Sequence, residues 1–353
     1  MSTPRVPHLG IVWLTLILST GCTLPATSPA ATSPARTTAH PRVLVVDTDM
    51  AADDWLAILY VLQRPDVTLA AITVTGAGEA HCTPGIRHAL GLMTLAGNAR
   101  VPVACGRESP LRGEHVFPGG WRDRVDSLLG LTLPDGQEAV SSQTAVELLA
   151  TTIQASPDKV TVLTLGPLTN VAEALQADPS LVDQIDAIYV MGGAVNVPGN
   201  VGASGVGIDN PVAEWNIYVD PYAANGVLQS GIPITLVPLD ATNHVPLTRK
   251  FYDNLKTNHA SPEATFVYDV LTEQRAFIDS GGYSFWDPLA AAIVTDDSLA
   301  TFRTEPICVV ETEGPESGWT KAGPGCPEAR VAISADGERF EQVFVETLNS
   351  PSP

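Results

Sequence analysis

Short runs of consecutive apolar residues alternate along this chain with stretches whose apolar residues recur every three to four positions. The runs predict strands that are buried on both faces, and they occupy residues 43–47, 68–74, 101–104, 160–165, 187–190 and 234–238. The stretches predict amphipathic helices, and they occupy residues 55–62, 86–95, 144–154 and 168–175. This alternation predicts an α/β fold with a mainly parallel sheet and helices on both faces.

The last third of the chain departs from the alternation. Residues 262–278 predict one long helix, and residues 307–310 and 329–333 predict a β pair that a helix at 340–348 closes. No repeat or internal linker interrupts the pattern, so one domain is expected from about residue 41 to 350.

The first forty residues differ in composition from the rest. Residues 1–21 resemble an export signal peptide, with an apolar segment followed by the small-residue sequence Ser-Thr-Gly before Cys22. A Cys in this position suggests lipidation, so we expect an exported protein that is lipid-anchored at Cys22 to the outer face of a bacterial cell membrane. An ordinary signal peptide or a short membrane anchor is the alternative. Residues 22–40, rich in Thr, Pro, Ala and Ser, predict an extended tether.

Composition narrows the possible partners. Apolar residues make up 44% of the chain, which excludes a disordered protein. Lys and Arg total 19 against 39 Asp and Glu, for a formal net charge of -20. This charge argues against nucleic acid and anionic membrane surfaces as partners, so contact with a membrane is expected only through the anchor.

Four further cysteines follow the tether: Cys82, Cys105, Cys308 and Cys326. Outside the cytoplasm an even number allows disulfides, with three possible pairings. A bond between Cys308 and Cys326 is plausible because a predicted strand-turn-strand segment separates them. Buried free thiols remain the alternative.

The densest group of acidic residues lies at the turn after the first predicted strand. Asp47, Asp49, Asp53 and Asp54 place four carboxylates within eight residues. In parallel sheets ligands bind outside the carboxyl ends of the strands, and like charges this close favour a bound cation. Calcium prefers such oxygen ligands. Helix capping would explain one or two of these acids, but not the pair at the end of an apolar strand.

The segment DTDMAADD resembles the DTDPGIDD signature of the inosine-uridine-preferring nucleoside hydrolases. Other motifs of that family follow in order, namely ITVTG at 72–76, LGPLTN at 165–170, MGG at 191–193, GN at 199–200, AEWN at 213–216 and DPLA at 287–290. The resemblance spans roughly residues 42–345. It implies a single α/β domain with calcium at the strand ends, and hydrolysis of the N-glycosidic bond of ribonucleosides.

The resemblance assigns roles at the cation. Asp49 would be the catalytic base that takes a proton from a calcium-bound water. Asp49 and Asp54 would bind the ion through carboxylates, Asp287 would add another from the opposite side, and Leu165 would contribute its backbone carbonyl. Asp47 would lie on the ion or directly behind its ligands.

The resemblance also implies substrate contacts. Asp53 would bind ribose hydroxyls, and carboxylate or amide side chains in the later motifs suit the hydroxyl edge of a sugar. The expected substrate-binding residues are Asp53, Met191, Asn200, Glu214, Trp215, Asn216, Trp286 and His81. Because the segment between Asn200 and Glu214 is longer than usual for the family, Asn210 is an alternative to Asn200.

Two positions differ from the family. Ala77 stands where an Asn usually binds ribose, so Glu79 or His81 would have to supply that contact. Trp286 stands where many members carry a His that protonates the leaving base, and an indole can stack on a base but cannot donate a catalytic proton. His81, His115 and His244 are candidates for the missing acid. The candidates for an aromatic base pocket are Trp121, Trp215, Phe285 and Trp286.

The resulting expectation is a calcium-dependent ribonucleoside hydrolase. A non-catalytic ribose- or nucleoside-binding lipoprotein, and a hydrolase for another N-riboside, are the alternatives. Asp49 favours catalysis, since a pure binding protein needs no base to activate water. By resemblance to the family, a homodimer or homotetramer is also expected.

Overall fold

The structure, a computed structural model, describes residues 1–2, 41–98, 100–136 and 140–350. The chain divides into residues 1–38 and residues 39–353. The expected signal peptide, its Cys22 and the tether lie outside the described residues, apart from residues 1 and 2. No helix in the described part of the chain is long and apolar enough to cross a membrane.

The second unit is built on a nine-stranded sheet of order β3-β2-β1-β4-β5-β6-β9-β7-β8. Neighbouring strands from β3 to β9 pair in parallel, whereas β7 pairs antiparallel with both β9 and β8. The strands are β1 (Arg42–Thr48), β2 (Val67–Val74), β3 (Val103–Cys105), β4 (Val160–Thr164), β5 (Ile185–Met191), β6 (Ile234–Val237), β7 (Ala300–Val309), β8 (Thr320–Ala322) and β9 (Glu328–Ala335). The predicted α/β fold with a mainly parallel sheet is therefore confirmed.

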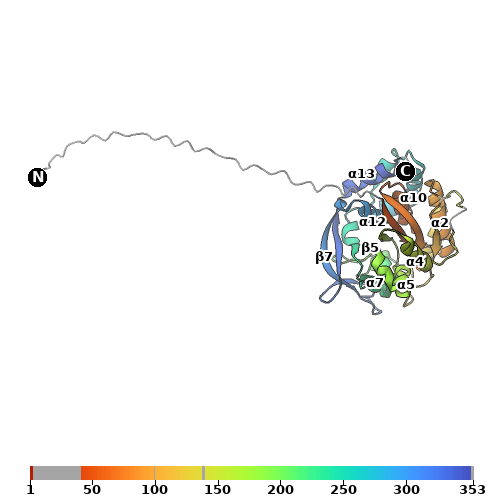
Figure 1. The fold of residues 1–353 in the computed structure, drawn as a ribbon. Helices are drawn as coiled ribbons and strands as arrows, with labels where there is room; N and C mark the ends of the chain where they lie inside the picture. The colour runs from red at the N-terminus through yellow and green to blue at the C-terminus, as the bar shows by residue number, and fades with distance from the viewer. Residues whose placement is uncertain (3–40, 99, 137–139, 351–353) are drawn as a thin grey trace, which may run out of the picture. The chain divides into compact units, whose positions relative to one another are not determined.

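Helices cover both faces of this sheet (Figure 1). In β1, Leu44 and Val46 pack into one apolar layer and Val45 packs into the other, as the alternation of side chains in a strand requires. The first layer is covered by α1 (Ala52–Leu62), α2 (Cys82–Leu95), α10 (Pro262–Glu273), α12 (Trp286–Thr295) and α13 (Gly337–Leu348). The second is covered by α4 (Ala145–Ala155), α5 (Thr169–Ala177) and α7 (Pro221–Leu228).

Shorter elements connect these layers. The remaining α-helices are α3 (Gly119–Asp126), α6 (Trp215–Val219), α8 (Leu239–Thr242), α9 (Arg249–Leu255) and α11 (Arg275–Asp279). The 3-10 helices are η1 (Leu128–Gly130), η2 (Pro179–Gln184), η3 (Gly202–Ser204) and η4 (Asp297–Leu299).

The predicted helix at 262–278 is wrong in one respect. The chain leaves helical geometry at Gln274, with φ -91° and ψ 10°, so the segment forms α10 and α11 instead of one helix. The break turns Phe277 back onto the ring of Tyr283, with 5.3 Å between the ring centroids. Neither Gly nor Pro marks this break, so no local pattern predicts it.

Two disulfide bonds tie the start of one helix and one loop of the second unit to its sheet. Cys82 at the start of α2 is bonded to Cys105 in β3, and Cys308 in β7 is bonded to Cys326 in the loop before β9. The plausible pairing of Cys308 with Cys326 is thus confirmed, and the alternative of free thiols is wrong.

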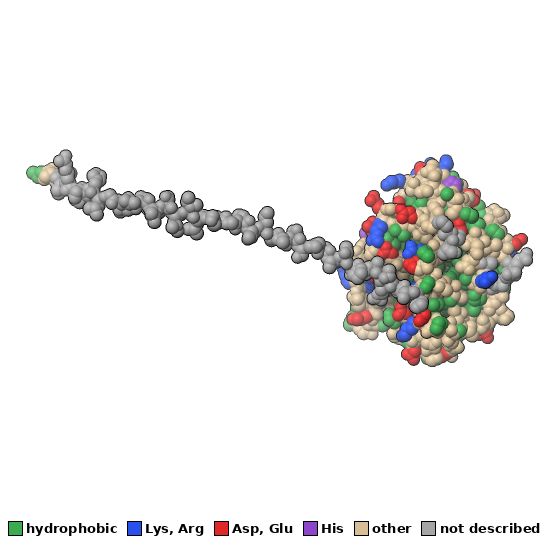
Figure 2. All heavy atoms as spheres, turned by 45° about the horizontal axis from the view of Figure 1, so that its top comes forward, with side chains coloured by type: hydrophobic (Ala, Val, Ile, Leu, Met, Phe, Trp, Pro, Cys, Tyr) green, Lys and Arg blue, Asp and Glu red, His purple; other side chains and the backbone are tan. Residues whose placement is uncertain are grey.

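On the face drawn in Figure 2, acidic and basic side chains of the described residues are intermixed. This face shows no extended basic surface among those residues. This face therefore carries no concentrated patch of basic side chains of the kind that binds nucleic acid.

Candidate active site

The carboxyl ends of the central strands open into a pocket of about 580 Å³, a volume within the usual range of small-molecule sites. The site residues expected from the sequence that line it are Asp49, Asp53, Asp54, Leu165, Met191, Asn200, Glu214, Trp215, Asn216, Trp286 and Asp287. Most come from the ends of β1, β4 and β5 and from the first residues of α1, α6 and α12 or the turns before them, and Asn200 comes from the loop after β5. A parallel sheet gathers these distant segments because its strands all end at the same edge.

Asp49 is held tightly at the end of β1. Its carboxylate accepts hydrogen bonds from the backbone N–H groups of Ala51 at 3.3 Å and Glu79 at 3.2 Å. A Cβ added to Gly78 would lie 2.1 Å from the Cβ of Asp49, and one added to Gly166 would lie 2.7 Å from it. Only glycine fits at these two positions, so Asp49 is enclosed on two sides by backbone.

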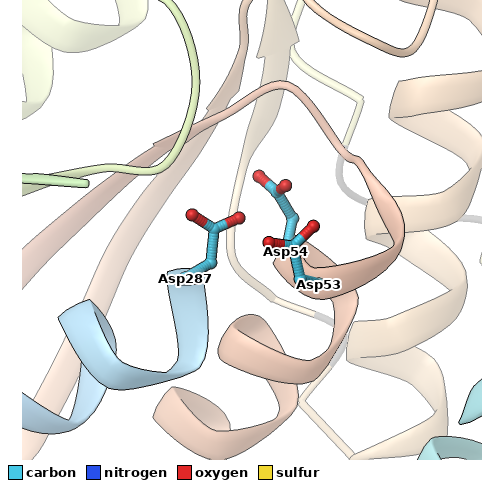
Figure 3. A group of neighbouring side chains, drawn as sticks. All are labelled: Asp53, Asp54 and Asp287. Carbon is cyan, nitrogen blue, oxygen red and sulfur yellow. The ribbon is translucent and has the colours of Figure 1, made fainter. Parts of the chain in front are cut away.

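Three carboxylates from two helices face one another beside Asp49. Asp53 and Asp54 lie in the first turn of α1 and Asp287 in the first turn of α12, with their side chains directed into the space between the helices (Figure 3). One oxygen from each lies within 4.8 Å of the others. Oδ2 of Asp54 and Oδ1 of Asp287 are buried without a hydrogen-bond partner among the described residues. Converging oxygens that lack donors fit a hard cation such as calcium.

Burial makes these acids reluctant to ionise in the absence of a cation. Desolvation raises the pKa of Asp49 to about 6 and that of Asp53 to about 7. Burial, and then the charge of a neighbouring aspartate, raise the pKa of Asp54 and of Asp287 well above the ordinary value. A bound cation would reverse this preference, because it stabilises the charged forms.

Asp47 lies behind the pocket rather than in its lining. It is fully buried, and its Oδ1 accepts from Thr73 at 2.6 Å and from Asn170 at 2.8 Å. Its other oxygen has no partner among the described residues, and burial raises its pKa to about 7. Of the two positions expected for Asp47, this geometry favours the one behind the ligands.

Glu214 and Asn216 form a rigid polar wall at the start of α6. The Glu214 carboxylate accepts from the backbone N–H groups of Asn216 and Gly193, both at 3.0 Å. The Asn216 amide donates to the carbonyl oxygens of Leu165 at 3.1 Å and Met191 at 3.3 Å. Desolvation raises the pKa of Glu214 to about 7. The AEWN motif therefore also fixes the Leu165 carbonyl expected at the ion.

The long segment before α6 leaves Asn200, not Asn210, at the pocket. Asn200 lines it, and its side-chain oxygen accepts from the Trp215 backbone N–H at 3.1 Å. Asn210 is buried outside the lining, where its amide donates to the Ser317 carbonyl at 2.7 Å and accepts from the Ala213 N–H at 2.9 Å. The alternative role for Asn210 is not supported, because its side chain holds the loop together.

Aromatic side chains form two walls away from the carboxylates. One wall is Trp215, which stacks on Phe117 at 5.2 Å between ring centroids and meets Trp121 edge-on at 5.3 Å. The other is Tyr283, with Phe277 at 5.3 Å and Trp286 at 5.4 Å. All six line the pocket. Phe285, also expected there, is instead in the core, where it packs edge-on against Phe251 at 4.8 Å.

None of the three candidate histidines lines the pocket. The His81 ring is 2.6 Å from an Asp126 carboxylate oxygen. The His115 ring lies between the Tyr218 carbonyl at 2.7 Å and Glu313 at 2.9 Å. The expected substrate contact by His81, and the acid role of His81, His115 or His244, therefore have no support in this geometry.

The pocket also contains residues that the sequence did not single out, among them Arg124, Gln274, Phe277 and Tyr283. They lie in α3, in α11 and in the loops flanking α11. No motif marks them, because they reach the pocket only through the packing of helices that are distant in sequence. Glu79, one of the two candidates for the sugar contact, does line the pocket.

Comparison with known proteins decides the family. The family described as inosine-uridine preferring nucleoside hydrolase matches residues 44–342. The chain belongs to this family. A nucleoside hydrolase of this kind is an enzyme that acts on N-glycosidic bonds, and the match covers the range over which the motifs were expected.

Nucleoside hydrolases with different base preferences are similar to this chain. The pyrimidine-specific ribonucleoside hydrolase RihA of Escherichia coli O8 is 33% identical over 326 residues, covering 86% of this chain and 97% of RihA. The plant nucleoside hydrolase PpNRh1 has a TM-score of 0.78 and 29% identity, covering 88% and 100% of the two chains. The purine-preferring ribonucleoside hydrolase of Gardnerella vaginalis has a TM-score of 0.75 and 27% identity, covering 87% and 98%.

Proposed function

We propose that this nucleoside hydrolase cleaves the N-glycosidic bond of ribonucleosides in a calcium-dependent reaction, with Asp49 as the catalytic base. The observation that carries the proposal is the division of one pocket into a carboxylate end at the strand termini and an aromatic end. A ribonucleoside has the same division, since its sugar carries hydroxyls and its base is a flat ring.

The carboxylate end suits the cation. Asp54 and Asp287, two of the three converging carboxylates, would hold it. Asp49 and the carbonyl of Leu165, which line the same pocket, would complete its ligands, and Asp47 would support them from behind. When bound, calcium would offset the repulsion between the carboxylates and increase the acidity of water at the site. The unpartnered oxygens of Asp54 and Asp287 support this assignment.

The side chains divide the chemistry among them. Water attacks the anomeric carbon while Asp49 accepts its proton. The bond to the base breaks with its electron pair on the base nitrogen, and positive charge develops on the sugar ring. Glu214 and Asp53 place negative charge beside that ring and accept hydrogen bonds from sugar hydroxyls. Asn200 and Asn216 complete the polar wall around the sugar.

The base would lie at the aromatic end, stacked on Trp286 or Trp215. An indole cannot protonate the departing base, and none of the described lining residues is a histidine. Substrates whose leaving groups need little protonation should therefore react relatively well. Because the similar enzymes named above differ in base preference, the test includes nucleosides with both purine and pyrimidine bases.

The decisive test is ribose release from a panel of nucleosides, with and without a calcium chelator. We expect turnover that the chelator abolishes and added calcium restores. Binding of nucleosides without any release of ribose would favour the alternative of a non-catalytic binding protein. Turnover confined to other N-ribosides would favour the other alternative.

We also propose that the protein is exported and lipid-anchored at Cys22, on the evidence of its N-terminal sequence. Cys22→Ser should then move the protein from the membrane fraction to the soluble fraction. A wild-type protein that is already soluble, and that begins after residue 22, would contradict the anchor.

A further inference from the structure

Several polar residues in the pocket have no role in the reaction described above. Arg124, Gln274 and Ser204 are hydrogen-bonded to other residues, but two further polar groups are not. They are the carboxyl group of Glu79, in the loop between β2 and α2, and the hydroxyl of Tyr283, in the loop before α12. Neither makes a side-chain hydrogen bond to any described residue. Both are held in place by their surroundings, so their position is a property of the fold.

The backbone on both sides of Glu79 is fixed by hydrogen bonds. Its N–H donates to Asp49 at 3.2 Å, and its carbonyl accepts from Nε of Arg122 at 3.3 Å. The same guanidinium donates to the Gly76 carbonyl at 2.9 Å. Arg122 is itself buried, although its helix is otherwise largely exposed. The loop therefore presents the Glu79 side chain to the pocket in a defined way.

The Tyr283 hydroxyl is deeply placed. Only 3% of the residue is exposed, and the hydroxyl has no hydrogen-bond partner among the described residues. The contacts of the ring with Phe277 and Trp286 prevent it from swinging away. Tyr283 lines the same pocket as Asp53, Asp287 and Glu79, and its hydroxyl carries a hydrogen that it can donate.

We propose that Glu79 and Tyr283 contact the sugar of the bound nucleoside, with Glu79 accepting from one ribose hydroxyl and Tyr283 donating to another. This inference rests on the proposed function, and it adds two residues to the recognition of the substrate. Sugar hydroxyls both donate and accept. Asp53 and Glu214 can only accept when ionised, so Tyr283 supplies the complementary donor.

The neighbouring Ala77 explains why Glu79 is needed. Ala77 packs into an apolar cluster with Phe117 and Trp215 and offers no polar atom to a sugar. Two residues later the loop presents a carboxyl group to the same pocket. The Glu79 backbone N–H donates to Asp49 at 3.2 Å, so this residue lies at the carboxylate end, where the sugar is proposed to lie.

The experiment pairs enzyme variants with substrates that each lack one hydroxyl. The kcat/KM of wild type, Glu79→Ala, Glu79→Gln and Tyr283→Phe is measured on uridine and inosine and on their 2′-, 3′- and 5′-deoxy forms. With the ribonucleosides, Glu79→Ala should lose about 10- to 100-fold and Tyr283→Phe about 3- to 10-fold. Glu79→Gln, which keeps an acceptor oxygen, should recover part of the loss.

The decisive result is non-additivity. For each variant, there should be one deoxy substrate on which its kcat/KM is almost equal to that of wild type. On that substrate the hydroxyl that the mutated side chain would contact is already absent. Equal losses on every substrate would overturn the sugar contact. Glu114→Ala and Tyr222→Phe, which remove the same groups outside the pocket lining, should leave all values unchanged.

Calorimetric binding of the same nucleosides separates this inference from the proposed function. If the wild type binds nucleosides but releases no ribose, the proposed hydrolysis is wrong, and the same pattern in binding constants would still support the contacts. If the wild type neither binds nor hydrolyses any of them, both ideas are wrong.

Discussion

The two ends of the pocket are built in different ways. The carboxylate end is positioned by the backbone. Asp49 directly follows β1 and is enclosed by Gly78 and Gly166, and the three converging aspartates lie in the first turns of α1 and α12. The aromatic end is positioned by contacts between side chains of helices and loops. Rings pack around Trp215 on one side and around Tyr283 on the other.

This difference means that catalysis depends on one end of the pocket and the choice of substrate on the other. A side chain positioned by strand ends and helix starts can move little, which suits a cation and a catalytic base that need fixed geometry. A wall made from packed rings can be altered by changing one ring without shifting the sheet. We therefore expect changes at the carboxylate end to abolish turnover and changes at the aromatic end to redistribute it among substrates.

The largest effect is expected from Asp54→Ala, which removes a buried carboxylate from the cation site. Bound calcium and activity should fall together, with activity reduced by about 10³-fold or more. Calcium content by elemental analysis and kcat are the measurements. The control is Asp240→Asn, because Asp240 lies near a strand end outside the pocket lining and accepts hydrogen bonds from the backbone N–H groups of Val195 and Asn196. Unchanged calcium in Asp54→Ala would contradict the ligand assignment.

Asp49→Asn tests the base separately from the cation. The amide keeps one oxygen for the ion and loses the ability to accept a proton. Turnover should fall by about 10²–10⁴-fold, whereas bound calcium should fall much less. If turnover of Asp49→Asn stayed within a few-fold of wild type, another group would have to be the base.

The aromatic end is tested at Trp286 by comparing inosine with p-nitrophenyl riboside. Because a general acid contributes about 10²–10⁴-fold, its absence should make inosine the far poorer substrate. Trp286→Ala should mainly raise KM, and Trp286→His should raise turnover of inosine. Equal turnover of the two substrates by the wild type would show that an acid is present.

The smallest effect is expected from a change of pH on the thermal stability of the protein without a bound cation. Burial raises the pKa of Asp47 and of Asp53 from 3.8 to about 7 in the folded state. Between these pH values the folded state holds protons that the unfolded state has released, so stability falls as pH rises through the window. In chelator, Tm should be about 5–10 °C lower at pH 8 than at pH 5.

Two additions sharpen the stability measurement. Calcium should raise Tm more at pH 8 than at pH 5, because it binds the ionised carboxylates. Asp53→Asn should reduce the dependence of Tm on pH in chelator, since it removes one of the titrating groups. A Tm in chelator that is equal or higher at pH 8 would refute the pH argument.

Sequence reasoning was most reliable where chemistry and topology coincide. Asp49, Asp54 and Asp287 could be placed together because each adjoins a strand end or helix start in a recognisable motif. It was least reliable for isolated side chains. His81 and Phe285 have the right chemistry for a site, yet one pairs with Asp126 and the other packs in the core. No local pattern distinguishes these outcomes.

The sequence by itself determined the alternating apolar runs, and with them the parallel sheet and the edge at which its carboxylates gather. The reason is that side-chain period and strand direction are local properties of the chain. Only the tertiary structure decided that Glu79 and Tyr283 share a pocket, that Asn200 lines it and Asn210 does not, and that Gln274 breaks a helix. These depend on contacts between segments far apart in sequence, where the energy of packing outweighs local preference.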